Sequence, residues 1–296
     1  MIKHQEVLTV DKEQLGDDEM ILAIASGKGG TGKTTLAVNL ALSLDRVQML
    51  DCDVEEPNDH LFLACDPKKI TDVVKPVPVI DEEKCTGCGE CARFCAYNAL
   101  AAVGKKVLVF PELCHGCGGC RLVCPEGAVS ETERVLGTLE SDRCGGIHIT
   151  QGRLRLGEPL ATPVVKAVTG QIDNGSDVII DAPPGTSCPV IEAVGPADFV
   201  LLVTEPTPFG LHDLKLAVEV MREIKKPFAV VVNREGSGND GVDRYCEREG
   251  IDIMLKIPQD RKIAELYSRG TPFVEEMPQW KTRFRELHDR IREVVK

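Results

Sequence analysis

The sequence predicts an α/β fold, a doubly wound and mainly parallel sheet into which a small cysteine-rich α+β domain is inserted. Short apolar runs alternate with stretches whose apolar residues recur at helical spacing. The first run leads through a glycine-rich turn into such a helical stretch, and most of the cysteines lie together in the middle of the chain. The apolar runs lie at 21–26, 47–50, 177–182, 199–204 and 228–233, and the helical stretches at 36–44 and 214–224. In such a sheet, ligands bind beyond the carboxyl ends of the strands.

The change in composition predicts a discontinuous arrangement of two domains. Residues 1–80 and 134–296 carry the alternating pattern and form one domain, and residues 81–133 form the insert. Within the insert, Lys105–Phe110 reads as a short strand.

Composition limits the classes of function. The chain has 296 residues, 43% of them hydrophobic, and a net charge of −12 spread along its length. Binding to duplex nucleic acid requires clustered Lys and Arg, so we expect no nucleic-acid partner. The N-terminal stretch Met1–Met20 lacks the apolar segment of a signal peptide, and no run reaches the ~18 apolar residues of a membrane span. We therefore expect a cytoplasmic protein, in which disulfides are unusual, so the spacing of the 13 cysteines is read for metal binding instead.

A phosphate-binding loop follows the first apolar run, and its motif is G-x-x-x-x-G-K-[ST]. Its backbone amides would cradle phosphates, Lys33 would reach the β and γ oxygens of ATP, and the Thr34 hydroxyl would hold Mg²⁺. The alternative is a glycine-rich turn that arose by chance. The expected nucleotide-binding residues are Gly27, Lys28, Gly29, Gly30, Thr31, Gly32, Lys33, Thr34 and Thr35. Lys28 is extra to this scheme, and it could simply be a solvated lysine at the loop tip.

Eight cysteines form two near-copies of C-x2-C-x2-C-x3-C, the run that wraps a [4Fe–4S] cluster. The first copy is Cys85, Cys88, Cys91 and Cys95, and the second is Cys114, Cys117, Cys120 and Cys124. A pair of zinc sites is the alternative, but zinc sites do not require this matched spacing.

The loop G-K-G-G-T-G-K-T resembles the deviant Walker A loop of the MinD/Mrp family of ATPases. The whole chain, from about residue 20 to 280, resembles the branch of that family with an inserted bacterial ferredoxin domain. This resemblance implies that Lys28 reaches across a nucleotide-sandwich dimer to the phosphates of the partner subunit. It also implies that the fourth cysteine of each run crosses over, so that Cys124 joins the first cluster and Cys95 the second. Ala96 departs from the family pattern, which has proline after the first run.

The resemblance also assigns residues outside the phosphate loop. D-C-D-V-E-E-P-N resembles switch I, with Asp51 near the metal, Asp53 near the attacking water and Asn58 close by. D-A-P-P-G-T-S resembles switch II, with Asp181 holding a Mg²⁺-bound water and Gly185 sensing the γ-phosphate. Alternatively, Asp51 and Asp53 are ordinary acids at the end of a strand.

Two further segments match positions that surround the base in this family. Asn233, followed by Arg234 in V-V-N-R, matches the residue that reads adenine, and Pro258 and Asp260 in I-P-Q-D match the loop that closes over the base. The Asn233 side chain could instead cap the loop that begins there.

Five cysteines remain, and we expect most of them to be small buried apolar residues. They are Cys52, Cys65, Cys144, Cys188 and Cys246. A less favoured alternative is a cluster bridging two subunits, ligated by Cys188 with Cys144.

The C-terminal segment from Trp280 places Phe284, Leu287, Ile291 and Val294 on one helical face. Such a face can bind a membrane or close the domain core. We favour docking on the domain, because acids are mixed into the opposite face.

Together these features predict a Mg²⁺-dependent ATPase that carries two [4Fe–4S] clusters and forms a homodimer or a heterodimer with a related ATPase. Lys28, Lys33, Asp53 and Asp181 would carry out hydrolysis. The favoured hypothesis is that ATP gates electron transfer to a redox or iron–sulfur partner protein. The alternatives are an iron–sulfur cluster assembly or carrier ATPase, and a positioning ATPase, similar to MinD, whose clusters sense redox state. We expect no membrane contact.

Overall fold

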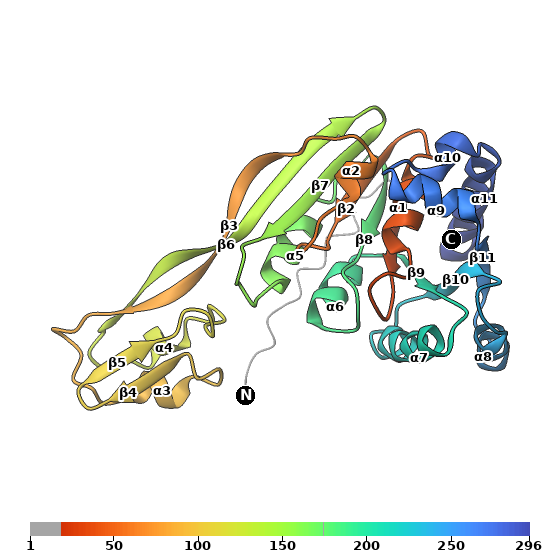
Figure 1. The fold of residues 1–296 in the computed structure, drawn as a ribbon. Helices are drawn as coiled ribbons and strands as arrows, with labels where there is room; N and C mark the ends of the chain where they lie inside the picture. The colour runs from red at the N-terminus through yellow and green to blue at the C-terminus, as the bar shows by residue number, and fades with distance from the viewer. Residues whose placement is uncertain (1–18, 174) are drawn as a thin grey trace.

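A nine-stranded sheet with helices on both faces dominates the computed structural model, and a small cysteine-rich lobe projects from one end (Figure 1). The structure describes residues 19–173 and 175–296. Most of the N-terminal stretch in which no signal peptide is expected lies outside these residues.

The order of strands in the large sheet is β11-β10-β9-β1-β8-β2-β7-β6-β3, and β4 and β5 form a separate hairpin. Neighbours from β11 to β7 are parallel, whereas β6 is antiparallel to both β7 and β3. The strands are β1 (Ile21–Ala25), β2 (Val47–Asp51), β3 (Lys68–Ile80), β4 (Leu100–Val103), β5 (Lys106–Val109), β6 (Val129–Cys144), β7 (Ile147–Leu154), β8 (Asp177–Asp181), β9 (Phe199–Thr204), β10 (Phe228–Glu235) and β11 (Ile253–Pro258).

Helices cover both faces of the sheet. One apolar core joins the sheet to α5, α6, α7 and α8, and the other joins it to α1, α9, α10 and α11. The helices are α1 (Lys33–Ala41), α2 (Asp59–Phe62), α3 (Glu90–Phe94), α4 (Gly119–Leu122), α5 (Thr162–Thr169), α6 (Cys188–Val194), α7 (Pro208–Glu223), α8 (Gly241–Glu249), α9 (Arg261–Ser268), α10 (Phe273–Glu276) and α11 (Gln279–Val295).

The predicted fold class is confirmed. The five apolar runs are β1, β2, β8, β9 and β10, and β1 is buried along its whole length, as expected for a strand covered on both faces. The short strand expected at Lys105–Phe110 is β5.

A long two-stranded arm carries the cysteine-rich lobe. β3 and β6 pair from Lys68 with Ser141 to Ile80 with Val129. The base of the arm belongs to the large sheet, because β6 also pairs with β7 from Gly137 onward. Beyond that point the two strands continue as a ribbon to α3, α4 and the β4–β5 hairpin (Figure 1). The predicted insert of residues 81–133 therefore begins where β3 ends, whereas its other limit falls inside β6.

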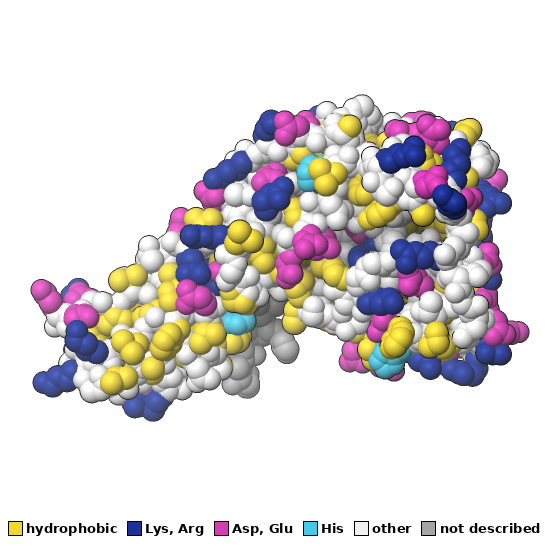
Figure 2. All heavy atoms as spheres, viewed as in Figure 1, with side chains coloured by type: hydrophobic (Ala, Val, Ile, Leu, Met, Phe, Trp, Pro, Cys, Tyr) yellow, Lys and Arg dark blue, Asp and Glu magenta, His cyan; other side chains and the backbone are white. Residues whose placement is uncertain are grey.

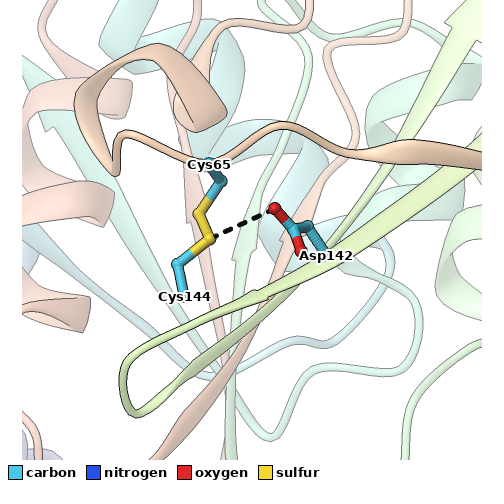
Figure 3. A group of neighbouring side chains, drawn as sticks. All are labelled: Cys65, Asp142 and Cys144. Atoms are coloured by element: carbon cyan, nitrogen blue, oxygen red, sulfur yellow. Dashed lines mark hydrogen bonds between the residues drawn. A yellow bond between two sulfur atoms is a disulfide. The ribbon is translucent and has the colours of Figure 1, made fainter.

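A disulfide joins Cys65 and Cys144 at the base of this arm (Figure 3). Cys65 precedes β3 and Cys144 ends β6, so the bond closes a loop of sequence separation 79 that contains the whole lobe. The expectation that the cysteines form no disulfide is therefore wrong for these two. The spacing of the cysteines along the chain did not predict this disulfide, because the two residues meet only through the pairing of β3 with β6.

The C-terminal helix α11 docks on the sheet as expected. Phe284, Leu287 and Ile291 are buried in the core next to α1, and Trp280 joins them. Val294 was expected on the same face but is 59% exposed, because the helix ends beyond the edge of the core. None of the helices among the described residues is long and apolar enough to cross a membrane.

The disulfide should contribute to stability by restricting the unfolded chain. We expect Cys144→Ser to lower the free energy of unfolding by about 2–4 kcal/mol, measured by denaturant titration without reductant. Cys188→Ser is the matched control, because Cys188 is free and exposed. Equal stabilities of the Cys144→Ser variant and the wild type would contradict this role.

Candidate functional site

The phosphate loop connects the end of β1 to the start of α1, and its glycines are required by its shape. Gly30 and Gly32 have φ values of 76° and 98°, in the left-handed region that glycine adopts at little cost. Gly27 leaves no room for a side chain, because a Cβ atom there would lie 2.1 Å from the backbone oxygen of Asp213. The loop therefore leads directly onto the open N–H groups of α1, which form a binding site for anions.

Lys33 and Thr34 begin α1 and lie next to the end of β8. Lys33 is only 7% exposed, and the Thr34 hydroxyl donates a 2.7 Å hydrogen bond to Asp181 Oδ2. β1 and β8 are parallel neighbours, so the loop after one strand meets the last residue of the other. Two segments that the sequence predicts for one site thus lie in contact.

Asp51 organises the segment that follows β2. Its carboxyl oxygens accept hydrogen bonds from the backbone N–H groups of Asp53 at 3.0 Å, Asn58 at 2.9 Å and Asp59 at 3.2 Å. These bonds fold residues 53–59 back over the end of β2 and place Asp53 near Lys33 and Asp181. Asp51 therefore has a structural task in addition to any contact with a metal.

Buried carboxyl groups crowd this end of the sheet. Burial, followed by the charge of Asp181, raises the pKa of Asp51 well above its usual range, and burial with the charge of Asp51 does the same for Asp59. Burial also raises the pKa of Asp181, although Lys33 opposes the shift. Asp53 is less enclosed, and burial together with Asp181 raises its pKa to about 6.

The carboxyl groups of Asp59 and Asp181 face each other. Among the described residues, neither oxygen of Asp59 nor Oδ1 of Asp181 has a hydrogen-bond partner. Buried carboxyl oxygens without partners, close to the Thr34 hydroxyl, suit a hard cation with oxygen ligands, such as Mg²⁺. Sequence reasoning missed Asp59, although it directly follows Asn58, the last residue of the switch I motif.

Lys28 points toward Glu205 within its own chain. Its ammonium lies 3.7 Å from Glu205, and its side chain is 33% exposed. Arg234 contacts the same carboxylate. Lys28 is thus held at the surface by an ion pair rather than extended freely into solvent.

The residues expected around the base lie close to the loop but already have partners. Asn233 Nδ2 donates a 2.8 Å hydrogen bond to the backbone oxygen of Thr31, and its Oδ1 accepts from the N–H of Arg234 at 2.9 Å. Asn233 therefore links the end of β10 to the phosphate loop. This contact resembles the alternative role, in which the Asn233 side chain caps a loop.

Four other predicted positions also lie near strand ends or helix starts. The N–H of Gly185 donates to the backbone oxygen of Ser26 at 3.0 Å, so the segment after β8 touches the phosphate loop. Pro258 ends β11, and Asp260 caps α9 by accepting a 2.7 Å bond from the N–H of Lys262. Thr35 lies in the first turn of α1, where its backbone oxygen accepts from Asn39 at 2.7 Å.

In the lobe, the first three cysteines of the first run lie with the last cysteine of the second. A pocket under the β4–β5 hairpin is lined by Cys85, Cys88, Cys91 and Cys124, together with Ile80 at the end of β3. The N–H of Ala128 points at Cys124 Sγ at 3.3 Å. The structure therefore brings together the four cysteines expected for the first cluster.

The other four cysteines gather nearer to the arm. Cys95 and Cys114 pack with Val77 of β3 in one small apolar core, and Cys120 lies near Cys114 and Cys117. Backbone N–H groups point at two of these sulfurs, from Ala99 to Cys95 at 3.3 Å and from Gly116 to Cys114 at 3.4 Å.

Among the described residues, only Cys65, Asp142 and Cys144 bring three ligand atoms within 4.8 Å of one another, and two of these atoms form the disulfide. In this structure no three of the eight lobe cysteines have their sulfur atoms within that distance of one another.

The three remaining cysteines differ in exposure. Cys52 and Cys246 are buried, as expected for small apolar residues. Cys188 is free and exposed at the start of α6. Its suggested companion Cys144 is bonded to Cys65, so the two do not form a ligand pair in this structure.

Hydrophobic side chains gather on the surface of the lobe (Figure 2). They come from α3, the β4–β5 hairpin and α4, and they include Phe94, Val103, Leu108, Phe110 and Leu122, which are 41–86% exposed. Exposed apolar groups of this size at one end of a molecule are typical of surfaces that contact another protein.

Several known proteins are similar in sequence to this chain over most of its length. A protein of uncharacterized function from Methanocaldococcus jannaschii is 31% identical over 262 residues, covering 86% of this chain and 92% of its own. The iron-sulfur cluster carrier protein of Pyrococcus horikoshii is 26% identical over 293 residues, covering 91% of this chain and 84% of its own.

Solved structures agree on the fold. The septum site-determining protein MinD of Pyrococcus horikoshii, complexed with Mg-ADP, aligns with a TM-score of 0.56 at 20% identity, covering 92% of this chain and 96% of that one. Residues 22–273 match the model of one nucleotide-binding family, and this range contains both the phosphate loop and the lobe. The chain belongs to the CobQ/CobB/MinD/ParA nucleotide binding domain family.

Proposed function

We propose that this protein is a dimeric ATPase that uses ATP binding and hydrolysis to control electron transfer through two [4Fe–4S] clusters. One observation supports this function above the others. The arm that bears the two cysteine groups is built into the same sheet as the nucleotide site, because β6 pairs with β7 and β7 pairs with β2, which ends at Asp51.

The residues at the strand ends suit hydrolysis of ATP by in-line attack of water. Lys33 would contact the β- and γ-phosphates, and Asp53 would orient the attacking water. Lys28 of the partner subunit would stabilise the charge that develops on the γ-phosphate. To do so, Lys28 must leave Glu205, which is possible because their ion pair is partly exposed.

Thr34 would hold Mg²⁺, Asp181 would hold a water bound to it, and Asp51 would act near the metal through a further water because its oxygens already accept backbone bonds. Bound there, Mg²⁺ neutralises phosphate charge. Asn233, Arg234, Pro258 and Asp260 would surround the adenine, and Gly185 would respond to the γ-phosphate.

The cysteine groups would each hold one cluster, the first through Cys85, Cys88, Cys91 and Cys124 and the second through Cys114, Cys117, Cys120 and Cys95. Bound there, each cluster supplies a site that accepts and releases one electron. The exposed apolar face of the lobe would contact the redox partner, and the pairing of subunits through Lys28 allows a homodimer or a heterodimer with a related ATPase.

A second candidate function is carriage of iron–sulfur clusters. Relatives from three Pyrococcus species bear the name iron-sulfur cluster carrier protein. The exposed thiol of Cys188 could ligate a labile cluster between two subunits. Attachment to a membrane through α11 has no such support, because its apolar face is packed on the core.

Removal of Lys28 should separate hydrolysis from binding. We expect Lys28→Ala to reduce the rate of ATP hydrolysis at least about 100-fold, because the partner's phosphates lose a positive charge. Its affinity for ATP should stay within about threefold of the wild type, since the residue acts across the dimer, whereas Lys33→Ala should lose both properties. Hydrolysis by Lys28→Ala at the wild-type rate would contradict a role across the dimer and would leave this lysine a role only within its own chain.

Iron analysis distinguishes the two candidate functions. Anaerobically purified protein should contain about eight iron atoms per chain, and Cys88→Ser should lose about four of them. Cys188→Ser should keep all eight and transfer electrons normally. Iron above eight per chain that disappears in Cys188→Ser, together with delivery of a cluster to an apo-protein, would favour the carrier function instead.

A further inference from the structure

We propose that Glu158 and Lys75 form the connection through which the nucleotide site acts on the lobe, and chiefly on its second cysteine group. This inference rests on the proposed function, because it identifies the residues through which ATP would control the clusters. Neither residue binds nucleotide or cluster, so both would be positioning residues.

The connection begins at the segment that follows β2. The backbone oxygen of Val54, next to Asp53, accepts a 2.7 Å hydrogen bond from the N–H of Leu154 at the end of β7. Arg155 then donates to the backbone oxygen of Leu136 in β6 at 2.8 Å. Movement of residues 53–59 on nucleotide binding would therefore displace the turn after β7.

Glu158 lies at the end of that turn and reaches the arm. Its N–H is held by the backbone oxygen of Arg155 at 3.0 Å, and its carboxylate lies 3.4 Å from the Lys75 ammonium of β3. The same carboxylate lies 3.2 Å from Arg134 of β6, which extends to Glu112 of the lobe, also at 3.2 Å. Lys75 and Arg134 are direct partners in the pairing of β3 with β6, so one carboxylate holds both strands of the arm.

The other end of the connection is the second cysteine group. Lys75 and Val77 lie on the same buried face of β3, and Val77 packs against Cys95 and Cys114. The residue between them, Pro76, has its backbone oxygen 3.9 Å from Cys114 Sγ, and a Cβ atom at Gly116 would lie 3.2 Å from it. A small shift of β3 at Lys75 would therefore change the surroundings of these cysteines.

Burial makes this ion pair suited to transmit a movement. The side chains of Lys75 and Glu158 are only 6% and 1% exposed, so water cannot readily solvate the two charges if they move apart. Separating buried charges is costly, and the turn and the arm should therefore move together. By contrast, the pair of Lys106 with Glu82 inside the lobe has exposures of 69% and 73%, and water screens it.

The two cysteine groups differ in their distance from this connection along the arm. Cys95 and Cys114 of the second group contact β3 at Pro76 and Val77, whereas the pocket of the first group is lined by Ile80, where β3 ends. The second group should therefore respond to nucleotide, and the first should mainly exchange electrons with the partner protein.

The test compares a double variant with a matched control, using the holoprotein and a non-hydrolysable ATP analogue with Mg²⁺. Lys75→Met/Glu158→Gln removes both charges of the buried pair together, which such pairs tolerate better than loss of one partner, and Arg134 keeps Glu112 as its partner. Lys106→Met/Glu82→Gln makes the same changes at the exposed pair of the lobe. The readout is hydrogen exchange of backbone amides in residues 72–78 and 132–138, with circular dichroism and iron content as checks on folding.

In the wild type and the control, the analogue should slow this exchange at least about fivefold, a typical size of coupling between two sites. In the double variant the change should fall below about twofold. Retention of the full response in the double variant, or lack of a response in the wild type, would overturn the inference.

Reduction potentials measured on the same samples separate this inference from the proposed function. If the arm of the wild type responds to the analogue while both cluster potentials and the rate of electron transfer stay constant, electron gating fails and the mechanical connection stands.

Discussion

The hydrogen-bond ladder between β2 and β7 is the interaction on which the rest of the structure depends. β2 ends at Asp51 in the nucleotide site, and β7 is the strand on which the arm is built. Because the pairing runs from Val47 with Ile147 to Asp51 with Gln151, the position of one strand end fixes the other. The lobe is thus attached to the nucleotide site through the sheet itself rather than through a flexible linker.

The buried carboxyl groups at the end of this sheet destabilise the folded state. Asp51, Asp59 and Asp181 are at most 1% exposed, and burial disfavours their charged forms. Such a cluster is retained when a cation or a donor compensates it, and a nucleotide with its metal would do so. Compensation would also change the repulsion that acts on residues 53–59, which gives ATP a physical means of moving the segment bonded to Leu154.

Features that depend on local sequence patterns could be predicted from the sequence. The buried parallel strands appear as apolar runs, the phosphate loop as glycine spacing, and the grouping of the eight cysteines followed from resemblance to a known family. The arm was missed because β3 and β6 lie partly in solvent and carry charged residues and prolines rather than a continuous apolar pattern. β7 was missed because its polar Thr150 and Gln151, although buried, interrupt the apolar pattern.

Other features depend on contacts between distant parts of the chain. The Cys65–Cys144 disulfide and the Glu158–Lys75 ion pair join residues about 80 positions apart, and only the folded arm brings them together. Asp59 and Glu158 resemble ordinary surface acids in the sequence, and their burial is a consequence of tertiary packing.

Control of the clusters by ATP is tested most directly by a potentiometric titration of the wild-type protein, followed by electron paramagnetic resonance, with and without the Mg²⁺ complex of a non-hydrolysable ATP analogue. We expect the reduction equilibrium of one cluster to change about tenfold, equivalent to about 59 mV for one electron, while that of the other changes little. Two potentials that are unaffected by the analogue, with an unchanged rate of electron transfer to an acceptor protein, would contradict this expectation.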